Sequence, residues 1–289
     1  MTTEIVELTD GLLRLRAPNP GPMTFSGTNS YLLRGGSNHG LSLPRGVAVI
    51  DPGPEDAAHL DAILGALTPY ERITHIFVTH AHLDHSPLAR PLARATGAKI
   101  YAFGSATAGR SAVMARLAAE ANPGGGEGVD AGFLPDITLQ DGETVTSDGW
   151  SLTALHTPGH FCNHMSFAWG DALFSGDHIM GWSTTVVAPP DGNMNDYLDS
   201  LDLLAHECQV HPLEFIMPAH GYVLGFAAQA IAQLKAHRLK REAKVIDAMR
   251  ALPHGTLEDW VAHAYADVPE RLWPVAARSL QAHVDRIQS

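Results

Sequence analysis

The pattern of hydrophobic and polar positions predicts strands in the first fifty residues, followed by alternating strands and helices. Short apolar or alternating runs bounded by Gly, Pro, Asn or Asp are typical of strands. Longer runs with apolar positions three or four apart are typical of helices. The predicted strands are 4–8, 12–15, 31–33, 47–50, 73–79 and 99–103, and the predicted helices are 57–67, 87–96 and 110–121.

A glycine-rich loop at 123–128 separates this half from a second β-rich half. The predicted strands that follow are 137–139, 144–145, 152–155, 165–169, 172–174 and 215–217, and the chain becomes helical beyond Gly225. Two β-rich halves, each followed by helices, favour an α/β fold with two sheets packed face to face and helices outside.

The C-terminal segment has its own helical pattern. Thr256 to Asp259 resembles a capping box, and apolar residues follow it at helical spacing. We therefore expect a catalytic domain over 1–227 and a small helical module over 228–289. The apolar residues of the module predict either its own core or a homodimer contact. They are Trp260, Tyr265, Leu272, Trp273, Leu280, Val284 and Ile287.

Composition fits a globular protein: of 289 residues, 45% are hydrophobic and 17% are charged. The N-terminus lacks the basic and apolar regions of a signal peptide, and no run of about 18 apolar residues predicts a membrane span. We therefore expect a soluble, cytoplasmic protein with no membrane partner. Its two cysteines, Cys162 and Cys208, are expected to remain thiols.

The net charge of −12 argues against a strong general attraction to nucleic acid or anionic membranes. The 17 histidines are the unusual feature of the composition. Histidine is the commonest side-chain metal ligand, so the spacing of these residues decides what they indicate.

Within residues 76–85, an apolar strand end leads directly into four side chains that are able to bind metal. These are His80, His82, Asp84 and His85. Where a strand ends, side chains that alternated between faces can converge on one cation. Imidazole nitrogens combined with a carboxylate oxygen suit Zn, Fe or Mn. A single histidine here would be more simply an exposed polar residue, but the four together favour a metal site.

Three further residues stand in similar settings: His160, Asp177 and His220 each follow a β-like run and lie close to a glycine. Glycine allows the backbone to turn sharply near a site. The recurrence predicts several loops that meet at one edge of the sheets.

In this order, the residues resemble the metallo-β-lactamase superfamily, whose pattern is a strand ending in HxHxDH followed by a later His, Asp and His. The resemblance covers roughly residues 5–225 and implies an αββα sandwich. It implies one metal held by His80, His82 and His160, and another held by Asp84, His85 and His220. Asp177 would bridge both metals, and Asp51 would support the site without binding metal.

Two divalent cations close together lower the pKa of a bridging water toward neutrality and so supply hydroxide. Asp84 is the candidate catalytic residue, because its carboxylate can orient that water and then move a proton. Zinc is the first choice of metal, with iron and manganese as alternatives. His164 and His178 are candidates for orienting the ligands, with core packing as the alternative. Cys162 and His75 are expected only to pack.

A finer resemblance is to the subgroup of beta-lactamase-like protein 2 and its bacterial relatives. It is carried by 27–32, by 175–185 and by the tail from His237. It implies a winged-helix-like tail, and it makes single-stranded RNA a candidate substrate because the animal member cuts RNA. A locally basic helix face would support this, with an ordinary solvated helix face as the alternative. It comprises Lys235, Arg238, Lys240, Arg241, Lys244 and Arg250.

The same ligand set also fits a glyoxalase II-like thioesterase or a β-lactamase acting on a small molecule. A binding module that kept the fold is the non-enzyme alternative. Substrate choice depends on loops such as 18–29, 104–134 and 182–195, which are expected to rim the pocket. These sequences offer two equal alternatives, an apolar pocket wall or simple packing, for Met23, Phe25, Trp182 and Met194.

Overall fold

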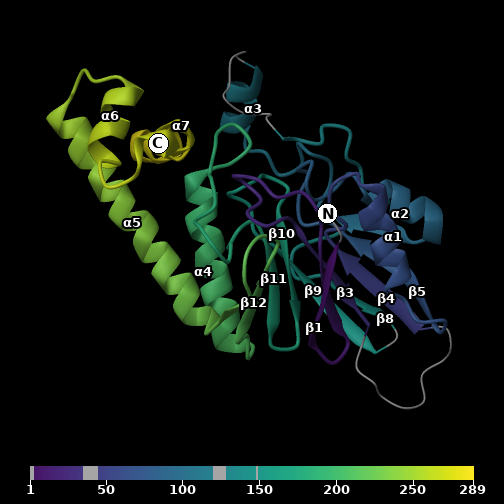
Figure 1. The fold of residues 1–289 in the computed structure, drawn as a ribbon. Coiled ribbons are helices and arrows are strands. Elements are labelled where there is room, and N and C mark those ends of the chain that lie inside the picture. Colours follow the sequence, from purple (N-terminus) through teal and green to yellow (C-terminus); the bar gives the residue numbers. More distant parts are fainter. Residues whose placement is uncertain (1–2, 35–44, 120–127, 148) are drawn as a thin grey trace.

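The computed structural model describes residues 3–34, 45–119, 128–147 and 149–289. The thirteen strands within these ranges form two mixed sheets that pack against each other (Figure 1). The predicted two-sheet α/β sandwich is therefore confirmed. Most of the predicted loop at 123–128 lies outside the described residues.

The first sheet has seven strands in the order β1 to β7, antiparallel from β1 to β4 and parallel from β4 to β7. Its strands are β1 Glu4–Thr9, β2 Leu12–Arg16, β3 Asn29–Leu33, β4 Arg45–Ile50, β5 Glu71–Phe77, β6 Lys99–Ala102 and β7 Ile137–Thr138. The helices of this half are α1 Ala57–Gly65, α2 Ala89–Thr96 and α3 Ala112–Ala119.

The second sheet has the order β13-β12-β11-β10-β9-β8, in which only β11 and β12 pair in parallel. Its strands are β8 Thr144–Ser147, β9 Trp150–His156, β10 Met165–Trp169, β11 Ala172–Gly176, β12 Phe215–Pro218 and β13 Leu224–Gly225. The core between the two sheets is rich in large buried rings, including Tyr31, Phe77, Phe167 and Phe174. These rings fix the spacing of the sheets, because aromatic side chains bury large areas in defined geometries.

One long helix was not predicted: α4, Met194–Val210, covers the second sheet. The turn-forming residues 189–192 and the predicted loop at 182–195 reach only the first residues of this helix, and no element was predicted for the rest. Asn193 ends that turn, and its side-chain oxygen accepts hydrogen bonds from the backbone N–H groups of Asn195 and Asp196. Met194 packs in the core of this layer at 1% exposure, so of its two predicted alternatives core packing holds and a place in a pocket wall does not.

The C-terminal segment is helical, as predicted. It comprises α5 Ala227–Ala251, α6 Leu257–Ala264, the 3-10 turn Glu270–Leu272 and α7 Trp273–Gln288. The capping box is confirmed, because Thr256 and Asp259 exchange side-chain hydrogen bonds with each other's backbone N–H. Figure 1 shows α5 lying beside α4, with α6 and α7 gathered near its C-terminal end.

The tail has its own core, in which Tyr265, Leu280 and Val284 are buried and both tryptophans pack. Leu272 is the exception, since it is 41% exposed. The predicted division at 227/228 remains a prediction. None of the helices in the described ranges combines the length and the apolarity that crossing a membrane requires.

Candidate metal centre

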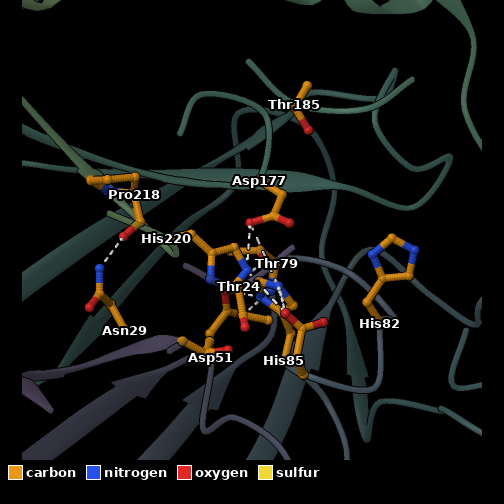
Figure 2. Close-up of polar contacts among 12 residues, drawn as sticks. Thr24, Asn29, Asp51, Thr79, His82, His85, Asp177, Thr185, Pro218 and His220 are labelled. Carbon is orange, nitrogen blue, oxygen red and sulfur yellow. Dashed lines mark hydrogen bonds and ion pairs between the residues drawn. The ribbon is translucent and has the colours of Figure 1, made fainter. Parts of the chain in front are cut away.

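The predicted ligands follow strands that end at one edge of the sandwich. β5 leads into the 80–85 segment, β9 precedes His160, β11 precedes Asp177 and β12 precedes His220. Because β11 and β12 are parallel neighbours, the last two side chains emerge side by side. Figure 2 shows Asp177, His220 and His85 turned toward one another.

The seven side chains form two adjoining clusters. In each cluster, one potential ligand atom from every member lies within 4.8 Å of the others. The clusters divide the residues as the family resemblance implies. The first contains His80, His82, His160 and Asp177, and the second contains Asp84, His85 and His220.

The first cluster is a group of imidazoles held close together. His82 Nδ1 lies 2.8 Å from His80 Nε2 and 3.2 Å from His160 Nε2. Burial and the neighbouring His160 ring lower the pKa of His82 to about 3. Burial and the surrounding histidines also hold the pKa of His80 well below its usual value. Neutral rings with converging nitrogens are suited to bind a metal ion.

Hydrogen bonds on the far side of the rings fix which nitrogen faces the cluster. The Thr79 hydroxyl donates its one hydrogen to Asp51 Oδ2 at 2.7 Å, so it can only accept from His80 Nδ1 at 3.0 Å. The Val186 carbonyl, 2.7 Å from His160 Nδ1, likewise requires that nitrogen to donate. Both rings therefore present an unprotonated Nε2 to the cluster.

Carboxylates surround the histidines of the second cluster, one from within it and the others from neighbouring residues. Asp84 Oδ2 lies 3.0 Å from His220 Nε2 and 3.3 Å from His85 Nε2. Burial alone would lower the pKa of His85, but Asp84, Asp177 and Asp51 outweigh it and raise this pKa well above its usual value. Concentrated negative charge of this kind also favours a metal cation.

Asp177 lies between the two clusters and turns one oxygen toward each. Its Oδ1 is 3.3 Å from His220 Nε2 and 3.7 Å from His85 Nε2, and its Oδ2 is 3.7 Å from His160 Nε2. The Oδ1 atom and His85 Nε2 are buried and form no hydrogen bond within the described part of the chain. Buried polar atoms without a partner are costly, and a bound cation would satisfy both. The donor set therefore fits two metal ions.

Asp51 lies behind the clusters, where the family resemblance places it. Its Oδ1 accepts from the Thr79 backbone N–H at 2.7 Å, and its Oδ2 lies 3.0 Å from His85 Nδ1. His164 is also behind the site, because its Nε2 accepts from the Asp177 backbone N–H at 3.2 Å. The His178 ring is buried against Tyr197, with centroids 4.4 Å apart. Neither ring nitrogen of His178 forms a hydrogen bond with any described residue.

Two residues predicted only to pack do so. His75 lies among aromatic rings, with its centroid 5.0 Å from Trp150 and 5.1 Å from Tyr101. Burial raises the pKa of the Cys162 thiol to about 11, which keeps it protonated near neutral pH. A protonated, buried thiol is neither a nucleophile nor a metal ligand.

Sequence reasoning missed three residues that position the site. Thr79 connects Asp51 to His80, as described above. The Asn29 amide donates to the carbonyls of Pro218 and Gly221, at 3.0 and 3.1 Å, and the Tyr31 hydroxyl also donates to Pro218. These bonds hold the loop that carries His220, and Figure 2 shows the one between Asn29 and Pro218. The one available signal was the short segment 27–32 that resembles the subgroup, and it does not reveal a partner 189 residues away.

The two-sheet sandwich and its paired His/Asp clusters are those of the metallo-beta-lactamase superfamily, and the family's sequence model matches residues 23–207. The chain belongs to this superfamily. A second model, the beta-lactamase associated winged helix domain, matches residues 256–289. The C-terminal helices are thus a winged-helix domain of that type.

The chain is 29% identical to the "Beta-lactamase-like protein 2 homolog" of Drosophila melanogaster, over 98% of this chain and 90% of the relative. It is 28% identical to the "Atrochrysone carboxyl ACP thioesterase" of Aspergillus chevalieri, over 92% of this chain and 77% of that relative. Among solved structures, a metallo-beta-lactamase family protein of Thermus thermophilus superimposes with a TM-score of 0.70 at 25% identity, over 96% of this chain and 93% of that one. The chain is therefore related along nearly its whole length to members of this superfamily, among them a thioesterase.

Proposed function

We propose that this protein is a dinuclear metal hydrolase that cleaves a carboxylic thioester. The observation that carries the dinuclear assignment is the position of Asp177, whose two oxygens face separate ligand clusters. The thioester assignment draws on the fungal relatives named as thioesterases, which share 27–28% identity with most of this chain.

His80, His82 and His160 would hold one ion, and Asp84, His85 and His220 the other, with Asp177 shared between them. Zinc is our first choice, and iron or manganese would suit the same donors. When bound, the ions would polarise the substrate carbonyl and lower the pKa of a water molecule.

The protein's own task is to hold and move a proton. Asp84 is suited to this task because its side chain is 26% exposed, whereas the neighbouring Asp177 side chain is 10% exposed. Its carboxylate would take a proton from the attacking water as the new C–O bond forms at the carbonyl carbon. When the C–S bond breaks, the same proton would go to the departing thiolate. Thr79 and Asp51 keep His80 and His85 aligned throughout.

The charge distribution supports a small acyl substrate better than RNA. Of the basic residues on α5, Lys235 pairs with Asp202, and both Arg241 and Lys244 pair with Asp267. Arg238 is 3% exposed, and its guanidinium donates to a backbone carbonyl. Binding of single-stranded nucleic acid needs a groove of free cations, so this ion pairing favours the thioesterase.

The test measures metal content by mass spectrometry together with hydrolysis of three substrates: an aromatic acyl thioester of N-acetylcysteamine, a single-stranded RNA and a cephalosporin. We expect about two metals per chain, as a dinuclear site requires, and thioester cleavage that a chelator abolishes. If the protein cleaved only the RNA or only the cephalosporin, and a chelator abolished that cleavage, the proposed substrate would change from a thioester to that compound. Absence of both metal and turnover would favour a binding module that kept the fold.

A further inference from the structure

A cavity of about 600 Å³ lies between the sandwich and the C-terminal helices. One wall comes from loop residues 21–25 and 180–186, and the other from α5 and residues 265–279. The cavity adjoins the metal centre, because Thr185 lines it while its hydroxyl lies 3.0 Å from His160 Nδ1. Nothing in the proposed chemistry at the clusters uses this cavity.

The loop wall presents a flat apolar surface. The rings of Phe25 and Trp182 stack with centroids 5.0 Å apart and planes 14° apart, and both residues are more than a third exposed. Phe25 adopts a φ of 55°, which is uncommon for a bulky residue, and Gly21 N–H donates to its carbonyl at 3.1 Å. Large rings held exposed in this way indicate a surface that binds an apolar partner.

The opposite wall is apolar with one free positive charge. Leu272, Val275 and Val268 line it, together with three arginines. Arg238 and Arg241 are already engaged, the first with the Thr185 carbonyl and the second with Asp267. Arg271 is exposed and has no hydrogen bond or ion pair with any residue that the structure describes.

The geometry points to an acyl-binding site in this cavity, selective for a planar acyl group with a carboxylate that pairs with Arg271. This inference rests on the proposed thioesterase function. The aromatic pair would receive the ring of the acyl group, and the scissile carbonyl would lie toward His160. The size of the cavity fits a small molecule, since such sites measure about 300–1,000 Å³. A nucleic acid would need several free cations, and Arg271 is the single unengaged arginine of the three.

The experiment compares two isosteric probes, the 6-carboxy- and 6-carbamoyl-2-naphthoyl thioesters of N-acetylcysteamine, in the wild type and in Arg271→Gln. We expect KM for the charged probe to rise about two- to fivefold in the variant, as loss of one partly solvated ion pair implies. KM for the neutral probe and kcat for both should stay unchanged. Lys240→Gln is the matched control, because it removes an exposed cation from the same C-terminal region outside the cavity. It should alter neither probe.

A binding measurement separates this inference from the proposed function. Isothermal titration calorimetry with 2,6-naphthalenedicarboxylate, on chelator-treated protein, should show binding that Arg271→Gln weakens about two- to fivefold and that Trp182→Leu also weakens. Such binding without any thioester hydrolysis would support the cavity and refute the thioesterase. Hydrolysis of both probes with no effect of Arg271→Gln on KM or on binding would overturn the inference and leave the thioesterase standing. If a short single-stranded RNA bound more tightly than the dicarboxylate, and lost that binding in Arg271→Gln, the acyl assignment would be wrong.

Discussion

Replacement of Asp177 by Asn tests the shared-ligand geometry directly. The amide keeps the shape of the side chain but removes a buried negative charge that lies 3.3 Å from His220 Nε2 and 3.7 Å from both His85 Nε2 and His160 Nε2. One pair of unit charges at 3.3 Å interacts by about 5 kcal/mol at an effective dielectric constant of about 20. Removing one member of a buried pair costs about 3–5 kcal/mol, so metal affinity should fall by about two to four orders of magnitude.

The assay is competition between the protein and a chelator of known affinity, followed by mass spectrometry of the bound metal and by thioester turnover. Asp171→Asn is the matched control, because this exposed residue precedes the opposite end of β11, far from the ligands. Both ions should bind more weakly in Asp177→Asn, since the carboxylate faces both clusters. Loss of one ion alone, or unchanged stoichiometry with unchanged turnover, would refute the bridging role.

Three further predictions concern the support of the site and the stability of the fold. Thr79→Val removes the hydroxyl between Asp51 and His80 and should weaken metal binding about 10- to 100-fold while the fold persists. Competition with a chelator measures this affinity. An unchanged affinity would show that the His80 ring does not need the Thr79 hydroxyl. Burial lowers the pKa of His59 to about 4, below the usual value near 6.5, so the neutral ring stabilises the fold above pH 6.5 and this contribution is lost as pH falls toward 4. The difference in unfolding free energy between the wild type and His59→Gln should therefore shrink by up to about 3 kcal/mol across that range. A difference that stayed the same at every pH would contradict this prediction. Thr256→Ala removes the α6 capping box and should cost about 1 kcal/mol in urea denaturation, whereas Thr256→Ser should retain most of the stability.

The sequence alone determined the class of the fold and the set of candidate ligands. Strands were readable because short apolar runs end at Gly, Pro or Asp, and every strand in the described ranges except β13 overlaps such a run. The candidate ligands were readable because His and Asp cluster immediately after those runs. Local patterns of this kind depend on residues that are near each other in the chain, and that is where sequence reasoning is strongest.

The tertiary structure decided what depends on residues distant in the chain. The sequence pattern predicted no element over most of α4, and packing against the second sheet stabilises that segment as a helix. Met194 belongs to the resulting core, while Phe25 and Trp182 come together from positions 157 apart in the sequence. The basic residues of α5 looked alike in sequence, yet Arg238 is buried and Arg241 is paired, so of the three arginines that line the cavity only Arg271 has no partner among the described residues. Charge and exposure are properties of three-dimensional neighbours, and one-dimensional spacing does not contain them.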